Sequence, residues 1–127
     1  GKNGNMSNCD GWHKSTGSKS SGSRELKYNV RIRNFSWMGI GSRVSAKVRH
    51  YRNNKRSRTK LRVDVGGVAF RYQQNSCQTS AAFADDKSKR RKKLRVREAF
   101  WQRMHSNPNL IMGTYQGGGI WEQLALH

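Results

Sequence analysis

The chain has 127 residues, enough for one small domain and too few for two well-packed ones. Its 26 Lys and Arg residues outnumber 7 Asp and Glu, giving a formal net charge of +19, while 33% of the residues are hydrophobic. This composition excludes a large core and favours a polyanionic partner, because bound anions relieve the self-repulsion of the chain. Nucleic acid is the first candidate partner, and an anionic membrane is the second.

Membrane and secretion signals are absent from the sequence. No apolar run is long enough to cross a bilayer, and the first residues lack the apolar centre of a secretory signal. Cys9 and Cys77 lie too far apart to suggest a disulfide framework. We therefore expect an intracellular protein in a reducing compartment, either the cytoplasm or an organelle matrix, with no membrane contact.

The first 23 residues are basic and rich in Gly, Ser and Asn. Such a composition buries too little apolar surface to offset its ordering entropy, so we expect residues 1–23 to be a disordered tail unless a partner orders them. Residues 24–127 are expected to form a single domain. Cys9 and His13 lie four residues apart, but no second close pair completes a zinc site, so we predict no metal.

Two segments alternate between apolar and polar residues, as half-buried strands do. In residues 25–34, the apolar positions are Leu26, Tyr28, Val30 and Ile32. In residues 43–52, Val44, Ala46 and Val48 share one face. The alternation changes phase at Phe35 and Trp37, which indicates either a bulge near Asn34 or a strand that ends at Arg33.

Residues 58–73 contain two alternating runs around Gly66 and Gly67. Two glycines accept the positive φ angles of a type I′ turn, so the pattern predicts a hairpin with strands over 58–65 and 68–73. Pairing Val65 with Val68 places six apolar side chains on one face, namely Leu61, Val63, Val65, Val68, Phe70 and Tyr72. Short connections make a meander of four antiparallel strands the simplest arrangement.

The rest of the chain suggests a helix. Residues 74–86 lose periodicity and read as a loop, with Asp85 and Asp86 suited to cap a helix over 87–106. Val96, Phe100 and Met104 would form its buried stripe. A short strand is expected over 110–115, a glycine-rich break over 117–119, and a last helical turn or packed tail over 120–125. The predicted fold is thus α+β, an antiparallel sheet of about four strands with one basic helix packed on it.

The cations recur through the four predicted strands of the sheet and the helix, which indicates a folded binding surface rather than a charged arm. The candidates for phosphate contact are Lys27, Arg31, Arg33, Arg43, Lys47, Arg49, Arg52, Lys55, Arg56, Arg58, Lys60, Arg62, Arg71, Lys87, Lys89, Arg90, Arg91, Lys92, Lys93, Arg95 and Arg97. The candidates for stacking on bases are Trp12, Phe35, Trp37, Tyr51 and Trp101. Cations interleaved with aromatic rings are typical of surfaces that bind single-stranded nucleic acid.

These features predict a non-catalytic nucleic-acid-binding protein, with RNA favoured over DNA. The wide spread of cations suggests a structural component of a ribonucleoprotein, such as a ribosomal protein, with other proteins of the same assembly as further partners. The alternative is a DNA-binding or viral genome-packaging protein, either nucleocapsid or coat, because charge alone does not distinguish the two polymers. We predict no cofactor and assign no catalytic residue.

A small basic nuclease is the rival enzyme class, with His50 or His105 as general base. The sequence places no carboxylate in an evident position to orient either imidazole. No aromatic octamer, GXXG loop or paired Cys/His finger is legible that would indicate a known nucleic-acid-binding module.

Overall fold

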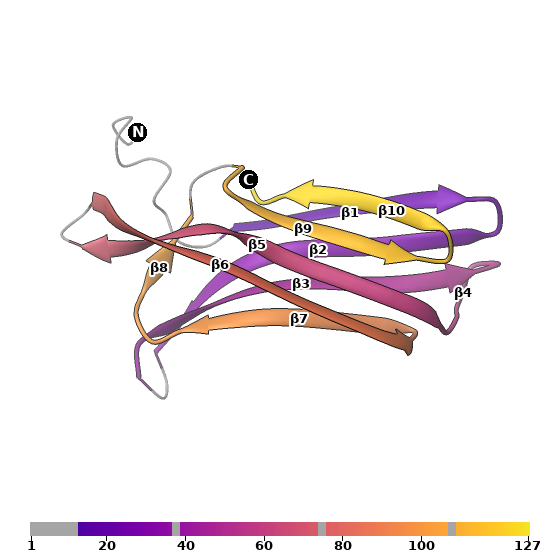
Figure 1. Ribbon diagram of the computed structural model, residues 1–127, viewed down its shortest axis with the longest axis horizontal. Helices are drawn as coiled ribbons and strands as arrows, with labels where there is room; N and C mark the ends of the chain where they lie inside the picture. The colour runs from indigo at the N-terminus through magenta and orange to yellow at the C-terminus, as the bar shows by residue number, and fades with distance from the viewer. Residues whose placement is uncertain (1–12, 37–38, 74–75, 107–108) are drawn as a thin grey trace.

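The computed structural model of the chain describes residues 13–36, 39–73, 76–106 and 109–127. It is all-β, with 80% of residues in strands and two antiparallel sheets that pack face to face (Figure 1). In the part of the chain that is described, no helix is long and apolar enough to cross a membrane.

The first sheet contains the N-terminal strands. Its members are β1 (His13–Ser21), β2 (Arg24–Phe35), β3 (Gly41–Arg52), β4 (Lys55–Arg56) and β7 (Lys93–Phe100). Strands β1, β2 and β3 pair in chain order, and both β4 and β7 pair with β3. The strands predicted over 25–34 and 43–52 are confirmed as β2 and β3.

The second sheet contains most of the C-terminal half. Its members are β5 (Thr59–Gln73), β6 (Ser76–Arg91), β8 (Met104–His105), β9 (Ile111–Gly117) and β10 (Ile120–Ala125). The strand order is β10-β9-β5-β6, and β8 pairs with β5 beyond the end of β9. The chain passes from the second sheet to the first at the turn between β6 and β7 (Figure 1).

The core lies between the sheets and is built from alternate residues of each strand. Leu26, Val30 and Ile32 of β2 are fully buried, as are Leu61 and Val63 of β5. At its centre the rings of Tyr28 and Tyr115 stack with their centroids 4.6 Å apart. The largely apolar inner faces of the two sheets cover each other, so neither needs a helix to cover it.

The Tyr115 hydroxyl is the polar group at this centre. It donates a 2.7 Å hydrogen bond to the carbonyl oxygen of Asn29, which satisfies it inside the core. Burial raises the pKa of Tyr115 well above its usual range, so the hydroxyl stays a neutral donor.

The predicted helix over 87–106 is wrong, and with it the α+β fold. This segment forms the end of β6, then β7 and β8. Leu94 and Val96 are buried while Lys93, Arg95 and Arg97 point outward, a period of two rather than 3.6. A helix would place cations at like-charged i,i+4 spacings on every side, whereas β7 turns its three cations to the outer face and leaves Leu94 and Val96 on the other face for the core. Asp85 and Asp86 therefore cap no helix and lie within β6.

The predicted hairpin at Gly66 and Gly67 is also wrong, because β5 runs straight through both glycines. Alternation therefore continues unbroken, so Ala69 is buried and Val68 and Phe70 are only half-buried. Gly67 has a φ of 138°, and its backbone lies close to the backbone of Leu110 and Ile111 at the start of β9. Next to it, Val68 N donates a hydrogen bond to the Leu110 carbonyl at 2.9 Å. The glycine is needed for that close approach rather than for a turn.

Two-residue turns do occur, but elsewhere. Gly118 and Gly119 have φ angles of 58° and 81° and join β9 to β10, as Asn53 and Asn54 join β3 to β4. The predicted break over 117–119 is thus a hairpin turn, and residues 120–125 form β10 rather than a helical turn or packed tail.

The ends of several predicted segments also change. Residues 13–21, predicted as disordered, form β1 and pair with β2, whereas residues 1–12 lie outside the described part. Most of the predicted loop over 74–86 belongs to β6. Strand β2 continues without a bulge to Phe35, which pairs with Gly41, so both alternatives for its end are wrong. The strand predicted over 110–115 is β9.

Candidate nucleic-acid interface

The outer face of the first sheet carries a dense array of cations, which we call the cationic face. Alternation turns one side chain in two outward on each strand, and the strand register aligns these side chains in rows across the sheet. The cationic face consists of Lys14 from β1, Lys27, Arg31 and Arg33 from β2, Arg43, Lys47 and Arg49 from β3, and Lys93, Arg95 and Arg97 from β7. Nine of these ten were predicted phosphate contacts, and Lys14 was missed because its segment was expected to be a disordered tail.

Like charges face each other directly across neighbouring strands. Arg33 pairs with Arg43, Lys27 with Arg49, and Lys47 with Arg95. Each such pair opposes folding by up to about 1 kcal/mol relative to a neutral pair. Among the described residues only one carboxylate, Glu25, stands on this face, at its far end beside Tyr51. This arrangement weakens the free protein, and a bound anion would relieve the repulsion.

Burial and neighbouring cations both disfavour the charged form of Lys47, at the middle of the cationic face. Burial first, and then Arg49, Arg95, Lys93 and Arg31, lower the pKa of Lys47 to about 8. The pKa of Arg31 is lowered for the same reasons, with burial first and then Arg33, Arg95 and Arg43. A bound phosphate would reverse both effects by supplying the missing countercharge.

Two aromatic rings mark the ends of the cationic face, and both are paired with cations. Lys27 Nζ lies 4.9 Å from the centroid of the Tyr51 ring, and the Arg43 guanidinium lies 5.7 Å from that of Phe35. These two rings were predicted to stack on bases. Of the other candidates, Trp101 is 83% exposed in the bend after β7, and Trp12 and Trp37 lie outside the described residues.

Two hollows indent the cationic face. One has a volume of about 250 Å³ and lies near Phe35, with five arginines around it. The other, of about 440 Å³, lies between β1, β2 and β3 and is lined by lysines, hydroxyls and Arg49. The face is therefore contoured, with an arginine-rich end and a lysine-rich end.

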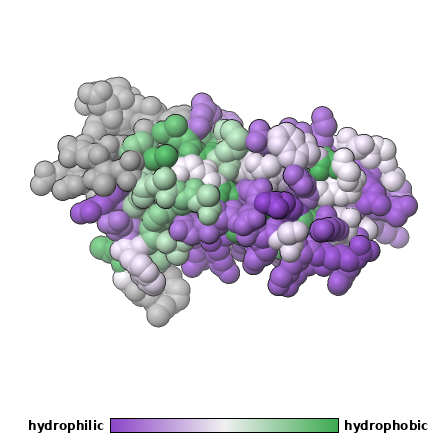
Figure 2. Space-filling model, viewed as in Figure 1, coloured by the Kyte–Doolittle hydropathy of each residue, from purple (hydrophilic) through white to green (hydrophobic). Residues whose placement is uncertain are grey.

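A second group of predicted cations gathers at one end of the sandwich. The turns β3–β4, β6–β7 and β9–β10 all lie there, and Figure 2 shows hydrophilic side chains covering that end while hydrophobic ones gather toward the other. The predicted contacts in or beside these turns are Arg52, Lys55, Arg56, Arg58, Lys60, Lys89, Arg90, Arg91 and Lys92. Lys87 lies further along β6, and Arg71 lies toward the opposite end of β5.

The outer face of the second sheet has mixed charge. Asp64 and Asp86 are register partners, and Arg62 bridges them, with its NH2 group 2.9 Å from an Asp86 carboxylate oxygen. This predicted phosphate contact is thus already engaged by two carboxylates. On the inner side of β6, a hydrogen bond with Asp85 raises the pKa of the Glu98 carboxyl.

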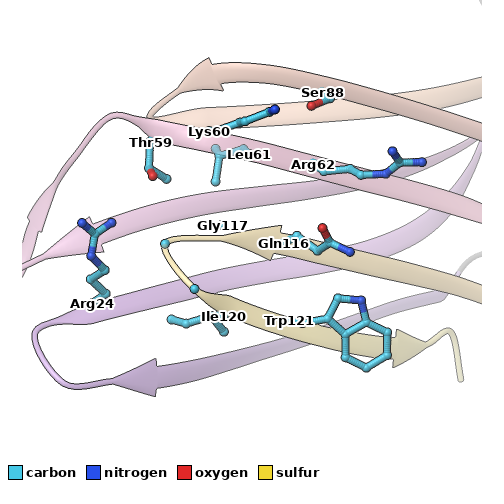
Figure 3. Close-up of a pocket in the computed structure, with 12 residues that line it drawn as sticks. Arg24, Thr59, Lys60, Leu61, Arg62, Ser88, Gln116, Gly117, Ile120 and Trp121 are labelled. Carbon is cyan, nitrogen blue, oxygen red and sulfur yellow. The ribbon is translucent and has the colours of Figure 1, made fainter.

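A large open hollow of about 870 Å³ lies on this second sheet, next to the β9–β10 turn (Figure 3). Trp121, Gln116 and Arg62 form one row across the strands there, while Arg24 and Lys60 stand at its margin. Trp121 is 54% exposed. It was missed as a stacking candidate because residues 120–125 were expected to form a helical turn or a packed tail; recognising the Gly118-Gly119 hairpin signal would have placed it on a strand.

The histidines proposed for a nuclease are buried. His50 is fully buried, its Nδ1 donates to the Ser57 carbonyl at 2.9 Å, and its Nε2 accepts from Arg24 at 3.4 Å. Both ring nitrogens thus hold the β3–β4 region together rather than facing a substrate. His105 is 6% exposed.

Comparison with known proteins adds no family. No protein-family model matches the chain, and no curated protein matches it.

Proposed function

We propose that this chain is a non-catalytic nucleic-acid-binding protein that holds RNA by its phosphates on the cationic face, as a structural component of a ribonucleoprotein. The observation that carries the proposal is the register of that face, where rows of Lys and Arg lie side by side with one carboxylate at the margin. Cations arranged at a surface in this way give affinity through phosphate contacts and counterion release.

The chemistry of the cationic face favours backbone contacts over base reading. Phe35 and Tyr51 are both half-buried and in contact with cations, so neither offers a free ring face as Trp101 does. Phosphate contacts fix the position of a nucleic acid but carry no sequence information. We therefore expect weak sequence preference on this face.

The width of the cationic face also favours RNA over a DNA duplex whose bases are read in the major groove. Direct reading of B-DNA uses a helix or a narrow ribbon inserted into the major groove, whereas RNA is bound largely through shape and backbone. The cationic face spans β1, β2, β3 and β7, which makes it about 14 Å wide at about 4.8 Å per strand spacing. That is too broad to enter a groove about 12 Å wide.

The first test is fluorescence anisotropy with single-stranded RNA, duplex RNA, single-stranded DNA and duplex DNA across a salt series, followed by recovery of each nucleic acid. We expect salt-dependent binding with RNA preferred and recovered intact. Preference for duplex DNA would support genome packaging or DNA binding instead, and cleaved product would indicate a nuclease.

The second test asks whether the cationic face is the surface used. The variant Lys27→Gln/Lys47→Gln/Arg49→Gln removes three charges from it, and Lys60→Gln/Lys89→Gln/Arg90→Gln removes three charges elsewhere. The first variant should weaken RNA binding and reduce the salt slope by about 2, at about 0.7 per contact for single strands. Equal losses in the two variants would show that net charge, and not this face, is responsible.

A further inference from the structure

The smaller hollow on the cationic face has a defined shape. Its floor is Ser45, which lies between Arg31 and Arg97 in one row across β2, β3 and β7. Ser45 points outward yet is only 6% exposed, because the longer side chains around it screen it. A short side chain in the centre of a ring of long ones produces a depression of about 250 Å³.

The walls of this hollow are guanidinium groups. Arg33 and Arg43 close one side, Arg95 closes the other, and with Arg31 and Arg97 they bring five formal positive charges to one cavity. No carboxylate lines it. A guanidinium presents its donors in a planar fork that binds two oxygens of one phosphate, which an ammonium does not.

The lysine-rich hollow on the same face provides an internal comparison. It is lined by Lys14, Lys27, Lys47 and one arginine, Arg49, together with hydroxyl groups. Ammonium groups act as point charges suited to a passing phosphodiester backbone. The segregation of arginines at one end thus indicates a different ligand group there.

Parts of the arginine hollow are already held in position. The Arg43 guanidinium lies over the Phe35 ring. Asn34 Oδ1 accepts a hydrogen bond from Ser42, whose Oγ in turn accepts one from Met104 N at 2.8 Å. Asn34 also lines the hollow. Pre-positioned donors reduce the ordering cost of binding.

We propose that the arginine hollow is a discrete site for a compact polyphosphate group, a di- or triphosphate, as found at the 5′ end of an RNA chain or on a free nucleotide. Several adjacent negative charges match the five guanidiniums better than the single charge of a phosphodiester. The volume of about 250 Å³ falls below the roughly 300–1,000 Å³ of sites for whole drug-sized ligands, so the hollow suits the charged group alone. The site lies on the face of the proposed function but does not depend on it.

The test uses isothermal titration calorimetry with inorganic triphosphate and with ATP. Fluorescence anisotropy then compares one RNA sequence that carries either a 5′-triphosphate or a 5′-hydroxyl. Both measurements use about 0.15 M salt, which screens long-range charge interactions. We expect saturable binding of inorganic triphosphate at one site. Tighter binding of the triphosphate RNA than of the 5′-hydroxyl RNA would identify RNA ends as the source, and tight binding of ATP without that difference would identify nucleotides.

Matched variants locate the site. Arg33→Gln/Arg97→Gln removes two exposed arginines of the hollow, and Lys27→Gln/Lys93→Gln removes two cations of the same face outside it. The first pair should weaken triphosphate binding at least about a hundredfold, at about tenfold for each charge-assisted contact, and the second pair less than about threefold. Equal effects of the two pairs would overturn the proposal.

A third variant separates shape from charge. Ser45→Leu fills the floor of the hollow without changing any charge, and thermal melting would confirm that it folds. It should weaken triphosphate binding much more than it weakens the binding of 5′-hydroxyl RNA, which has the rest of the cationic face to contact, and equal losses for the two ligands would contradict a discrete site. If the parent protein binds 5′-hydroxyl RNA but not triphosphate, the proposed polyphosphate site is wrong and the proposed function stands. If it binds triphosphate but not 5′-hydroxyl RNA, the polyphosphate site stands and the proposed function is wrong.

Discussion

Lys47 shows at the scale of one residue how function and stability oppose each other. Its pKa of about 8 lies below the ordinary value of 10.5, so the unfolded chain binds this proton more tightly than the folded one. The resulting destabilisation is fully present below pH 8 and disappears as pH rises from about 8 to 10.5, because the folded state there has already released the proton.

Lys47→Met should therefore stabilise the free protein at pH 7, by about 1 kcal/mol, while it weakens RNA binding. The parent protein should gain thermal stability relative to the variant as pH rises from 8 to 10, and its RNA affinity should fall more steeply than that of the variant between pH 7 and 9. Melting and anisotropy over this pH range provide the measurements. A variant that melts below the parent at pH 7 would contradict the predicted repulsion.

Trp121 carries a prediction about unpaired bases. It lines the open hollow of about 870 Å³ next to the β9–β10 turn, whose margin carries Lys60 and Arg24 (Figure 3). If a single strand continues around that end, a base can stack on the indole, and stacking contributes about 1–3 kcal/mol per base. Trp121→Ala should then weaken single-stranded RNA binding about fivefold or more and leave duplex RNA unaffected.

Trp101→Ala is the natural control, because Trp101 is more exposed but stands apart from this hollow. A larger loss in this variant than in Trp121→Ala would transfer the stacking role to Trp101, as the sequence predicts. No loss in either would confine the interaction to phosphates.

At the scale of the element, β5 depends on one glycine. A Cβ on Gly67 would clash with the Leu110 carbonyl oxygen and approach Ile111 Cα to 2.9 Å, and φ is 138°. Both contacts are with backbone, so neither can move aside like the end of a flexible side chain.

Gly67→Ala should therefore destabilise the protein by about 2–4 kcal/mol, combining backbone strain with a steric clash. Gly66→Ala is the matched control, since its Cβ would approach the Phe83 carbonyl only to 3.1 Å. Urea unfolding of both variants measures the difference. Equal and small effects would contradict the close approach of the backbone to Gly67.

At the scale of the whole molecule, a formal charge of +19 acts on folding and binding in opposite directions. Salt screens the repulsion within the free protein, so its melting temperature should rise between about 50 and 200 mM salt. RNA affinity should fall steeply over the same range, since counterion release drives binding. A saturating RNA should raise the melting temperature at low salt, by the equivalent of about 2.7 kcal/mol at a hundred times Kd. A melting temperature that falls with added salt in the free protein would contradict the self-repulsion argument.

Alternation along the chain determined a large part of the fold and most of the candidate site. The strands over 25–34 and 43–52, the burial of Leu61, Val63 and Val65, and the outward direction of six of the ten cations on the cationic face, those of β2 and β3, follow from a period of two. Such local patterns are readable because each side chain in a strand is assigned to a face by its neighbours alone.

Only the tertiary structure decided which strands pair and where the chain turns. Gly66 and Gly67 resemble a hairpin locally, yet antiparallel pairing with β9 on one side and β6 on the other makes them part of one long strand, and Gly118 and Gly119 form the turn instead. The basic segment 87–97 has no intrinsic preference strong enough to choose helix or strand, so pairing of β7 with β3 selects the strand. The arginine hollow has the same origin, since it is formed by residues of three strands that are brought together by register, a long-range property absent from any local stretch of sequence.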